Sequence, residues 1–165
     1  MKVAIICKIS LDGYINKPDR GKLDWGSRQD MEFFAAETRK AGVAIMGQTT
    51  FDTLPNPLPD RLNVVVTREQ KNDVDNVRYT SDSPKKIIDD LKNEGHNYIT
   101  VTGGSIINGL FMNAGVVTDL LITITPHVFG AGVPLFANLE HDMNLQLVDS
   151  RPLGPGEILN HYEVI

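Results

Sequence analysis

The chain has one cysteine and no long apolar segment, and these absences exclude several classes of protein. The single thiol, Cys7, cannot build a disulfide framework, and its place in an apolar run predicts a buried, inert thiol rather than a nucleophile. No stretch is long and apolar enough to span a membrane. Met1 and Lys2 lead directly into an apolar run without a signal-peptide pattern, so we expect a cytoplasmic protein.

Basic residues are also few, because 16 Lys and Arg face 21 Asp and Glu and the net charge is −5. A nucleic-acid partner is therefore not expected, although a local cationic pocket remains possible. The sequence contains neither a P-loop nor a nucleophile elbow. The histidines show no metal-ligand spacing, so we expect no metal site. They are His96, His127, His141 and His161.

The 165 residues, with 41% hydrophobic and 22% charged side chains, are typical of one globular domain, here taken as residues 1–165. Several apolar runs are continuous rather than alternating, which is typical of strands buried on both faces. The runs are Val3–Cys7, Val43–Met46, Leu62–Thr67, Tyr98–Val101, Leu120–Thr125, Leu145–Val148 and Leu159–Ile165.

Helical patterns lie between the early runs, at residues 28–41, 84–94 and 104–113. After residue 118 only strand-like runs remain, joined by Gly/Pro turns. This order predicts β–α repeats with an antiparallel ending. In the first helix, one apolar face is expected from Met31, Phe34, Ala35 and Thr38.

Two glycine turns follow predicted strands, at Gly47–Thr50 and at Thr102–Ser105. Glycine lets the backbone approach a ligand closely, and a helix start offers free N–H groups to an anion. Each turn alone is equally a tight turn, but the carboxyl ends of parallel strands share an edge, so together they indicate a nucleotide site. Arg68 and Lys71 are either solvated charges or partners of a ribose phosphate, which would favour NADPH.

Asp30 has two interpretations. It is the third residue after Ser27, so it fits a capping box at the start of the helix. It also shares a helical stripe with Phe34, Thr38 and Ala41, where a carboxylate at the edge of a buried face has a raised pKa and seeks a fixed donor. The preceding loop, residues 12–26, is either a lid or a surface excursion anchored by its tryptophan, Trp25.

These motifs together resemble a known family. The segment IMGQTTFDTLPNPLPDRLNVVVTR, residues 45–68, resembles the central part of dihydrofolate reductases, with their MG-x-x-T-[FWY] turn and PLP-x-R loop. The similarity continues in DW-x(4)-DMEFF at residues 24–34, VTGGSIING at 101–109 and DLLITIT at 119–125. The resemblance implies an α/β/α three-layer sandwich with a mixed, mostly parallel sheet and an antiparallel C-terminal hairpin. It also implies NADPH-dependent reduction of 7,8-dihydrofolate to tetrahydrofolate by a monomer or homodimer.

The resemblance assigns roles to individual residues. Asp30 would bind the pterin and promote its protonation, Thr123 would hydrogen-bond Asp30, and Trp25 would help to close the lid. Arg61 would pair with the glutamate carboxylate of folate, and a cis bond is expected between Gly103 and Gly104. The remaining substrate contacts would be Ile6, Leu23, Phe34 and Leu58. The contacts to NADPH would be Lys8, Ile15, Gly47, Gln48, Thr49, Thr50, Thr67, Arg68, Thr102, Gly103, Gly104, Ser105, Ile106 and Ile107.

Two segments depart from that family. KISLDG at residues 8–13 and VFGAGVPLF at 128–136 resemble the reductase domain of the riboflavin-pathway deaminase-reductase, which uses NADPH to reduce the ribosyl group of a pyrimidine phosphate. That domain carries an acidic residue where this chain has Thr102, and it lacks the helix carboxylate. The alternatives to dihydrofolate are therefore 5-amino-6-(5-phosphoribosylamino)uracil or another pteridine or pyrimidine. A non-catalytic nucleotide-binding module is a third possibility.

Overall fold

The structure is a computed structural model that describes residues 1–19 and 25–165. The helices are α1 (Arg28–Ala41), α2 (Gln48–Phe51), α3 (Pro84–Asn93) and α4 (Ser105–Asn113). The strands are β1 (Lys2–Ile9), β2 (Tyr14–Asn16), β3 (Val43–Gly47), β4 (Leu62–Val66), β5 (Val77–Thr80), β6 (Tyr98–Val101), β7 (Asp119–Ile124), β8 (Val133–Pro134), β9 (Leu145–Gly154) and β10 (Glu157–Val164).

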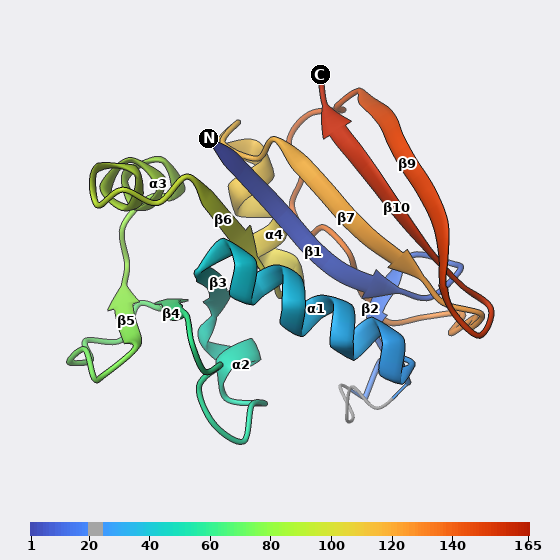
Figure 1. Ribbon diagram of the computed structural model, residues 1–165, viewed down its shortest axis with the longest axis horizontal. Helices are drawn as coiled ribbons and strands as arrows, with labels where there is room; N and C mark the ends of the chain where they lie inside the picture. The colour runs from blue at the N-terminus through green and yellow to red at the C-terminus, as the bar shows by residue number, and fades with distance from the viewer. Residues whose placement is uncertain (20–24) are drawn as a thin grey trace.

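Eight strands form one sheet in the order β5-β4-β3-β6-β1-β7-β10-β9. The six strands from β5 to β7 pair in parallel, whereas β10 pairs antiparallel with both β7 and β9. Helix α1 lies in front of the central strands and α4 behind them (Figure 1). The predicted three-layer sandwich with a mostly parallel sheet and an antiparallel C-terminal hairpin is confirmed.

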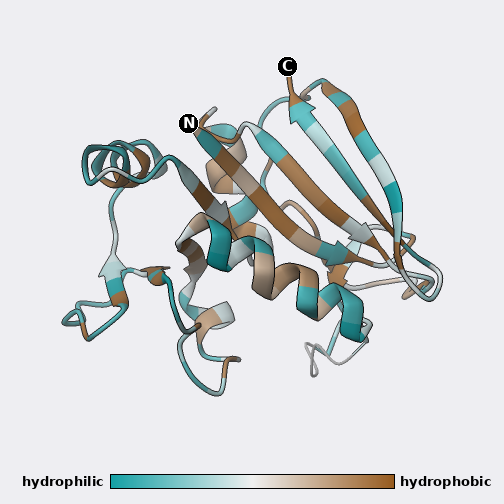
Figure 2. Cartoon of the chain, in the orientation of Figure 1, coloured by the Kyte–Doolittle hydropathy of each residue, from teal (hydrophilic) through white to brown (hydrophobic). Residues whose placement is uncertain are grey.

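The two-residue periodicity of a strand divides the core between the two faces of the sheet. In β1, Val3 and Ile5 pack into a large cluster with residues of α3 and α4, whereas Ala4 and Ile6 pack into a smaller cluster beneath α1. Both pairs are buried, so β1 is apolar on both faces, and Figure 2 shows it and β7 as mostly hydrophobic strands. This explains the continuous apolar runs in the sequence.

Helix boundaries follow the capping chemistry. Ser27 caps α1 by accepting from the Asp30 amide, and Gly42 ends the helix in the left-handed region at φ 76°. Ser83 caps α3, whose first residue is Pro84. Both starts are where the sequence places them.

The predicted apolar face of α1 is partly wrong. Met31 is 57% exposed, and Phe33, which was not assigned to that face, packs with Phe34 against the smaller core cluster. The buried residues of the helix are Asp30, Thr38 and Ala41, which lie on the stripe that the sequence predicts for Asp30. Tertiary packing, rather than side-chain hydropathy, fixes the rotation of this helix.

The loop over residues 12–26 also differs from expectation. It contains β2, which pairs antiparallel with β8 in a separate two-stranded sheet. Leu23, expected to contact the substrate, lies outside the described residues. In the described part of the chain, no helix combines the length and the apolar character needed to cross a membrane.

Gly109 gives a test of the packing behind the sheet. A Cβ atom at this position in α4 would lie 1.9 Å from the Ala137 carbonyl oxygen. Because that neighbour is backbone, we expect Gly109→Ala to lower the free energy of unfolding by about 1–3 kcal/mol or more, measured by urea denaturation. Leu110→Ala, at a 41% exposed position of the same helix, is the matched control. A loss for Gly109→Ala no larger than that of Leu110→Ala would contradict the packing described.

Candidate active site

The parallel register brings polar residues from distant parts of the sequence to one edge of the sheet. Lys8 lies near the carboxyl end of β1 and is in register with Thr123 of β7. Gly47 ends β3, and Thr102 follows β6. Because carboxyl ends of parallel strands share an edge, these residues line one region, and the first turn of α1 brings Asp30 to it.

Asp30 is the buried carboxylate of this region, with 7% of its surface exposed. Burial raises its pKa above the ordinary range, and the Glu157 carboxylate adds to the rise. A hydrogen bond with the Thr123 side chain and the charge of Lys8 oppose the rise without cancelling it. The Lys8 ammonium lies 3.9 Å from Asp30 Oδ2. The Asp30 side chain therefore faces Lys8 and Thr123, while its backbone amide takes part in the cap of α1.

Lys8 is more central than the sequence indicates. Its ammonium also lies 4.9 Å from the centre of the Trp25 ring, within range of a cation–π contact. A Cβ atom on Gly26 would lie 2.6 Å from Lys8 Nζ, so the absence of a side chain at residue 26 makes room for the lysine. The sequence marks Lys8 as a departure from dihydrofolate reductases, but its contact with Asp30 is visible only in the structure.

Trp25 closes this cluster from the outside. It is 8% exposed and makes edge contacts with Phe129 at 5.1 Å and His127 at 5.9 Å. Asp12 fixes the segment that carries Phe129, because its carboxylate accepts hydrogen bonds from the Phe129 and Gly130 amides. A hydrogen bond with Ser10 and these backbone amides lower the pKa of Asp12. Within the described chain, Trp25 Nε1 is buried without a hydrogen-bond partner, as for a donor facing a ligand.

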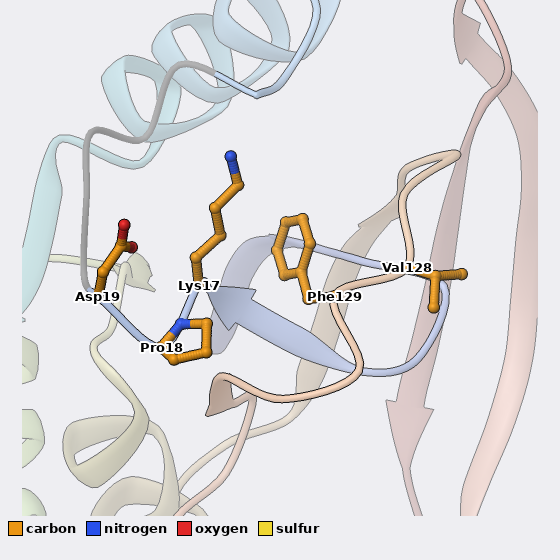
Figure 3. Close-up of a pocket in the computed structure, with 5 residues that line it drawn as sticks. All are labelled: Lys17, Pro18, Asp19, Val128 and Phe129. Carbon is orange, nitrogen blue, oxygen red and sulfur yellow. The ribbon is translucent and has the colours of Figure 1, made fainter.

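An open surface pocket of about 440 Å³ lies on the far side of Phe129 and is shown in Figure 3. Lys17 and Phe129 project into the same space there, with Nζ 5.8 Å from the ring centre. The contacts run from Phe129 to Trp25, then to Lys8 and Asp30. Phe129 therefore lines the pocket and also belongs to the chain of contacts that leads to Asp30. The pocket is lined by Lys17, Pro18, Asp19, Val128 and Phe129.

Arg61 is a buried cation, 6% exposed, at the entry to β4. Its Nε donates to Pro59 O at 2.8 Å, and its Nη1 donates to Ala35 O and to Thr38 Oγ1. These bonds anchor the guanidinium to α1, while Nη2 donates to no group among the described residues. Burial lowers the pKa of Arg61, so binding an anion would relieve the cost of its charge.

The other residues assigned to the substrate are not all together. Ile6 is buried at 3% exposure, and Phe34 packs against the same small cluster beneath α1. Leu58 lies in the loop before β4, where its amide donates to Asn63 Oδ1. The structure thus brings Ile6 and Phe34 together, while Leu58 stays in the loop that carries Arg61.

The two glycine turns lie against each other. The Gly47 amide donates to Gly103 O at 2.9 Å, and a Cβ atom on Gly104 would lie 3.3 Å from Thr50 Oγ1. A Cβ atom on Gly47 would lie 2.9 Å from Ile107, so backbone and side chains are tightly apposed here. The expected cis bond between Gly103 and Gly104 is confirmed.

Helices α2 and α4 begin at these turns without a side-chain cap, unlike α1 and α3. Their first amides therefore lack the side-chain acceptor that serine supplies elsewhere. Ser105 Oγ and Gln48 Oε1 are buried without a hydrogen-bond partner in residues 1–19 and 25–165. Free amides, an unpartnered hydroxyl and close backbone approach fit the phosphates of a dinucleotide.

The remaining residues assigned to the cofactor vary in position. Thr102 donates to Ile45 O and so links β6 to β3. Thr67 accepts from the Glu69 amide, and Arg68 is exposed. Lys71 is paired with Glu69 at 3.1 Å, which fits a solvated surface charge. Among the others, Ile15 lies in β2, whereas Thr49 and Ile106 are exposed on the first turns of α2 and α4.

Burial raises the pKa of the Cys7 thiol to about 11, as expected for an inert thiol. The structure, where it describes the chain, contains no group of three His, Cys, Asp or Glu side chains able to hold a metal ion.

A parallel sheet whose carboxyl edge combines two glycine turns with a buried carboxylate is the arrangement of an α/β dinucleotide-binding enzyme. The sequence matches the family model described as dihydrofolate reductase over residues 2–145. The chain therefore belongs to the dihydrofolate reductase family.

Individual relatives extend this result. The uncharacterized protein YwjB of Bacillus subtilis is 27% identical, over 98% of this chain and 97% of its own length. The dihydrofolate reductase of Candida albicans is 29% identical, over 66% of this chain and 60% of its own length. Both a protein without a characterised activity and a named reductase are thus similar to this chain.

Solved structures show the same fold. A protein of Shewanella sp. PV-4 assigned to riboflavin biosynthesis matches 100% of this chain and 99% of its own, with 25% identity and a TM-score of 0.84. Dihydrofolate reductase from Enterococcus faecalis, solved with NADP(H), matches 99% of this chain and 96% of its own, with 19% identity and a TM-score of 0.72. The second similarity shows the fold alone.

The raised pKa of Asp30 predicts a pH-dependent cost to stability. An acid whose pKa is higher in the folded than in the unfolded state lowers the free energy of unfolding once it ionises. For Asp30 this loss of stability grows as the pH rises above about 4, the ordinary pKa of an aspartate. We expect Asp30→Asn to unfold at higher urea concentration than the wild type at pH 7, with a difference that vanishes near pH 4. Asp142→Asn, at an exposed carboxylate, is the control. A stabilisation of equal size at both pH values would contradict this origin.

Proposed function

We propose that the protein is an NADPH-dependent reductase of an aminopyrimidine-containing ring, with 7,8-dihydrofolate as the leading substrate and tetrahydrofolate as the product. The observation that supports this most is Asp30, a buried carboxylate with a raised pKa, hydrogen-bonded to Thr123. A carboxylate in this setting accepts paired hydrogen bonds from the amino group and ring N–H of a pterin. Its raised pKa also suits it to promote protonation of the ring.

The residues around the two turns would hold the cofactor. Gly47, Gly104 and the first amides of α4 would contact its phosphates, and Ser105 Oγ would gain the partner that it lacks. When bound, NADPH supplies the hydride for the reduction. Trp25 and Phe129 would exclude water from the ring that Asp30 binds, since together they form the outer layer of the cluster. Arg61 would bind the carboxylate of the folate tail through Nη2.

Lys8 favours a second candidate. A lysine in contact with Asp30 neutralises part of the charge that would bind a protonated pterin, and it offers a donor to a hydroxyl or phosphate. A phosphoribosylaminopyrimidine carries sugar hydroxyls and a phosphate that such a donor would bind. The similarity to the Shewanella protein assigned to riboflavin biosynthesis supports the same alternative.

Asp30→Asn tests the leading proposal. The neutral amide cannot promote protonation, so we expect hydride transfer to dihydrofolate to slow by about 10²–10⁴-fold. The affinity for NADPH, measured by fluorescence titration, should not change. NADPH oxidation is followed with dihydrofolate and with the riboflavin-pathway pyrimidine in parallel, and NADH is the cofactor control.

The outcomes separate the alternatives. Near-normal turnover of dihydrofolate by Asp30→Asn would refute the assigned role. Turnover of the pyrimidine alone by the wild type would establish the second candidate. Binding of NADPH with no turnover of either substrate would indicate a non-catalytic module.

Arg61 distinguishes a folate from a smaller ring. If Nη2 binds the tail carboxylate equally in the ground and transition states, Arg61→Ala should raise the KM for dihydrofolate and change kcat little. Arg39→Ala removes an exposed cation that pairs with Asp60 and is the matched control. Arg61→Lys keeps the charge if Arg61→Ala does not fold. An unchanged KM in a folded Arg61 variant would favour the pyrimidine candidate.

A further inference from the structure

Glu157 is a buried carboxylate that the proposed chemistry does not use. It begins β10 and is 3% exposed. In the described part of the chain it forms no ion pair, although burial of an unpaired charge is costly. Both of its oxygens accept hydrogen bonds from one residue, since the Ser27 amide donates to Oε1 at 2.8 Å and the Ser27 hydroxyl donates to Oε2.

Ser27 is the N-cap of α1, and its hydroxyl accepts from the Asp30 amide. In a capping box, the side chain three residues after the cap accepts the amide proton of the cap. That residue is Asp30, but here Glu157 accepts this proton from a strand 130 residues away in the sequence. The Asp30 carboxylate instead contacts Lys8 and Thr123.

We propose that Glu157 is a positioning residue, which takes over the reciprocal cap of Ser27 and thereby keeps the Asp30 side chain pointed into the active site. This inference rests on the proposed function in so far as Asp30 serves the substrate. The orientation of Asp30 itself does not depend on the identity of that substrate.

The hairpin between β9 and β10 is shaped for this contact. A Cβ atom on Gly154 would lie 2.7 Å from Ser27 Oγ and 2.9 Å from Glu157 Oε2. Gly154, the last residue of β9, is paired with Glu157 in the register of the hairpin. The strand pair thus leaves room for the serine at the start of α1, and only glycine provides that room.

Glu157 also acts on Asp30 through its charge. The charged and titratable groups around Asp30 are Lys8 and Cys7 from β1 and Glu157 from β10. Lys8 favours the ionised form of Asp30, whereas Glu157 favours the protonated form. The hydrogen bonds of Glu157 to Ser27 can be separated from the effect of its charge on Asp30, because glutamine keeps the shape of the side chain and loses the charge.

The test compares three variants by ¹³C NMR titration of the Asp30 carboxyl group and by the pH dependence of kcat. In Glu157→Gln the amide can still accept from the Ser27 amide and donate to Ser27 Oγ. We expect the NMR chemical shift of the Ser27 amide to be unchanged, because the amide keeps its acceptor. The pKa of Asp30 should fall because the charge of Glu157 is lost, and kcat should change by less than about tenfold. In Glu157→Leu the Ser27 amide loses its acceptor, so Asp30 should turn to cap the helix.

For Glu157→Leu we therefore expect a fall in the pKa of Asp30 and a loss of kcat of about 10²-fold, with little change in the affinity for NADPH. Glu163→Gln, at an exposed position of the same strand, is the control and should match the wild type. If Glu157→Leu does not fold, Glu157→Ala, which also removes the acceptor of the Ser27 amide, takes its place.

An Asp30 titration in Glu157→Leu equal to that in Glu157→Gln would overturn the proposal, and so would a loss of stability with normal kcat. The titration needs no substrate, so its outcome is independent of the turnover assays. A larger shift of the Asp30 titration in Glu157→Leu than in Glu157→Gln, together with no reductase activity, would refute the proposed function and leave the positioning role intact.

Discussion

The parallel pairing of β1 on both of its edges is the constraint on which the rest of the structure depends. β1 is in register with β6 on one side and with β7 on the other. This register sets Lys8 beside Thr123 and brings both to the edge where the glycine turns follow β3 and β6. A shift of one residue would point the Lys8 side chain into the large core cluster. It would also move Val3 and Ile5 out of that cluster to the opposite face of the sheet.

The site concentrates polar groups that the fold alone would avoid. Asp30, Arg61 and Glu157 are all buried, where a charge is costly. The structure offsets part of this cost with hydrogen bonds from fixed partners, such as Thr123 and Ser27. Buried polar groups of this kind lower the stability of the fold, but they hold charges and donors in fixed positions around a ligand.

Local chemistry explains why much of the architecture is predictable from the sequence. Ser27, Ser83 and the glycine turns mark helix starts by backbone rules that act over a few residues. Continuous apolar runs identify the parallel strands because both faces of the sheet are covered. The resemblance to dihydrofolate reductases identifies the region of Asp30 and the two turns.

Long-range geometry explains what the sequence does not reveal. β2 and β8 are three and two residues long, too short for a periodic pattern. The exposure of Met31 reflects how α1 rotates on the sheet, which no local pattern encodes. Glu157 differs from its neighbours only in being an acid in an otherwise strand-like segment. Its partner Ser27 is 130 residues away, so only the folded hairpin reveals its contacts.

The space that Gly26 leaves for the Lys8 ammonium links the choice of residue at position 26 to the choice at position 8. A side chain at residue 26 would force the end of the Lys8 side chain to move, so we expect substitutions at the two positions to be non-additive. A shorter residue at position 8 would leave room for a side chain at position 26, whereas a side chain at 26 beside Lys8 would displace the lysine from its contacts with Asp30 and Trp25. Among relatives, these two positions should therefore change together, and a library aimed at a new substrate should vary them as a pair.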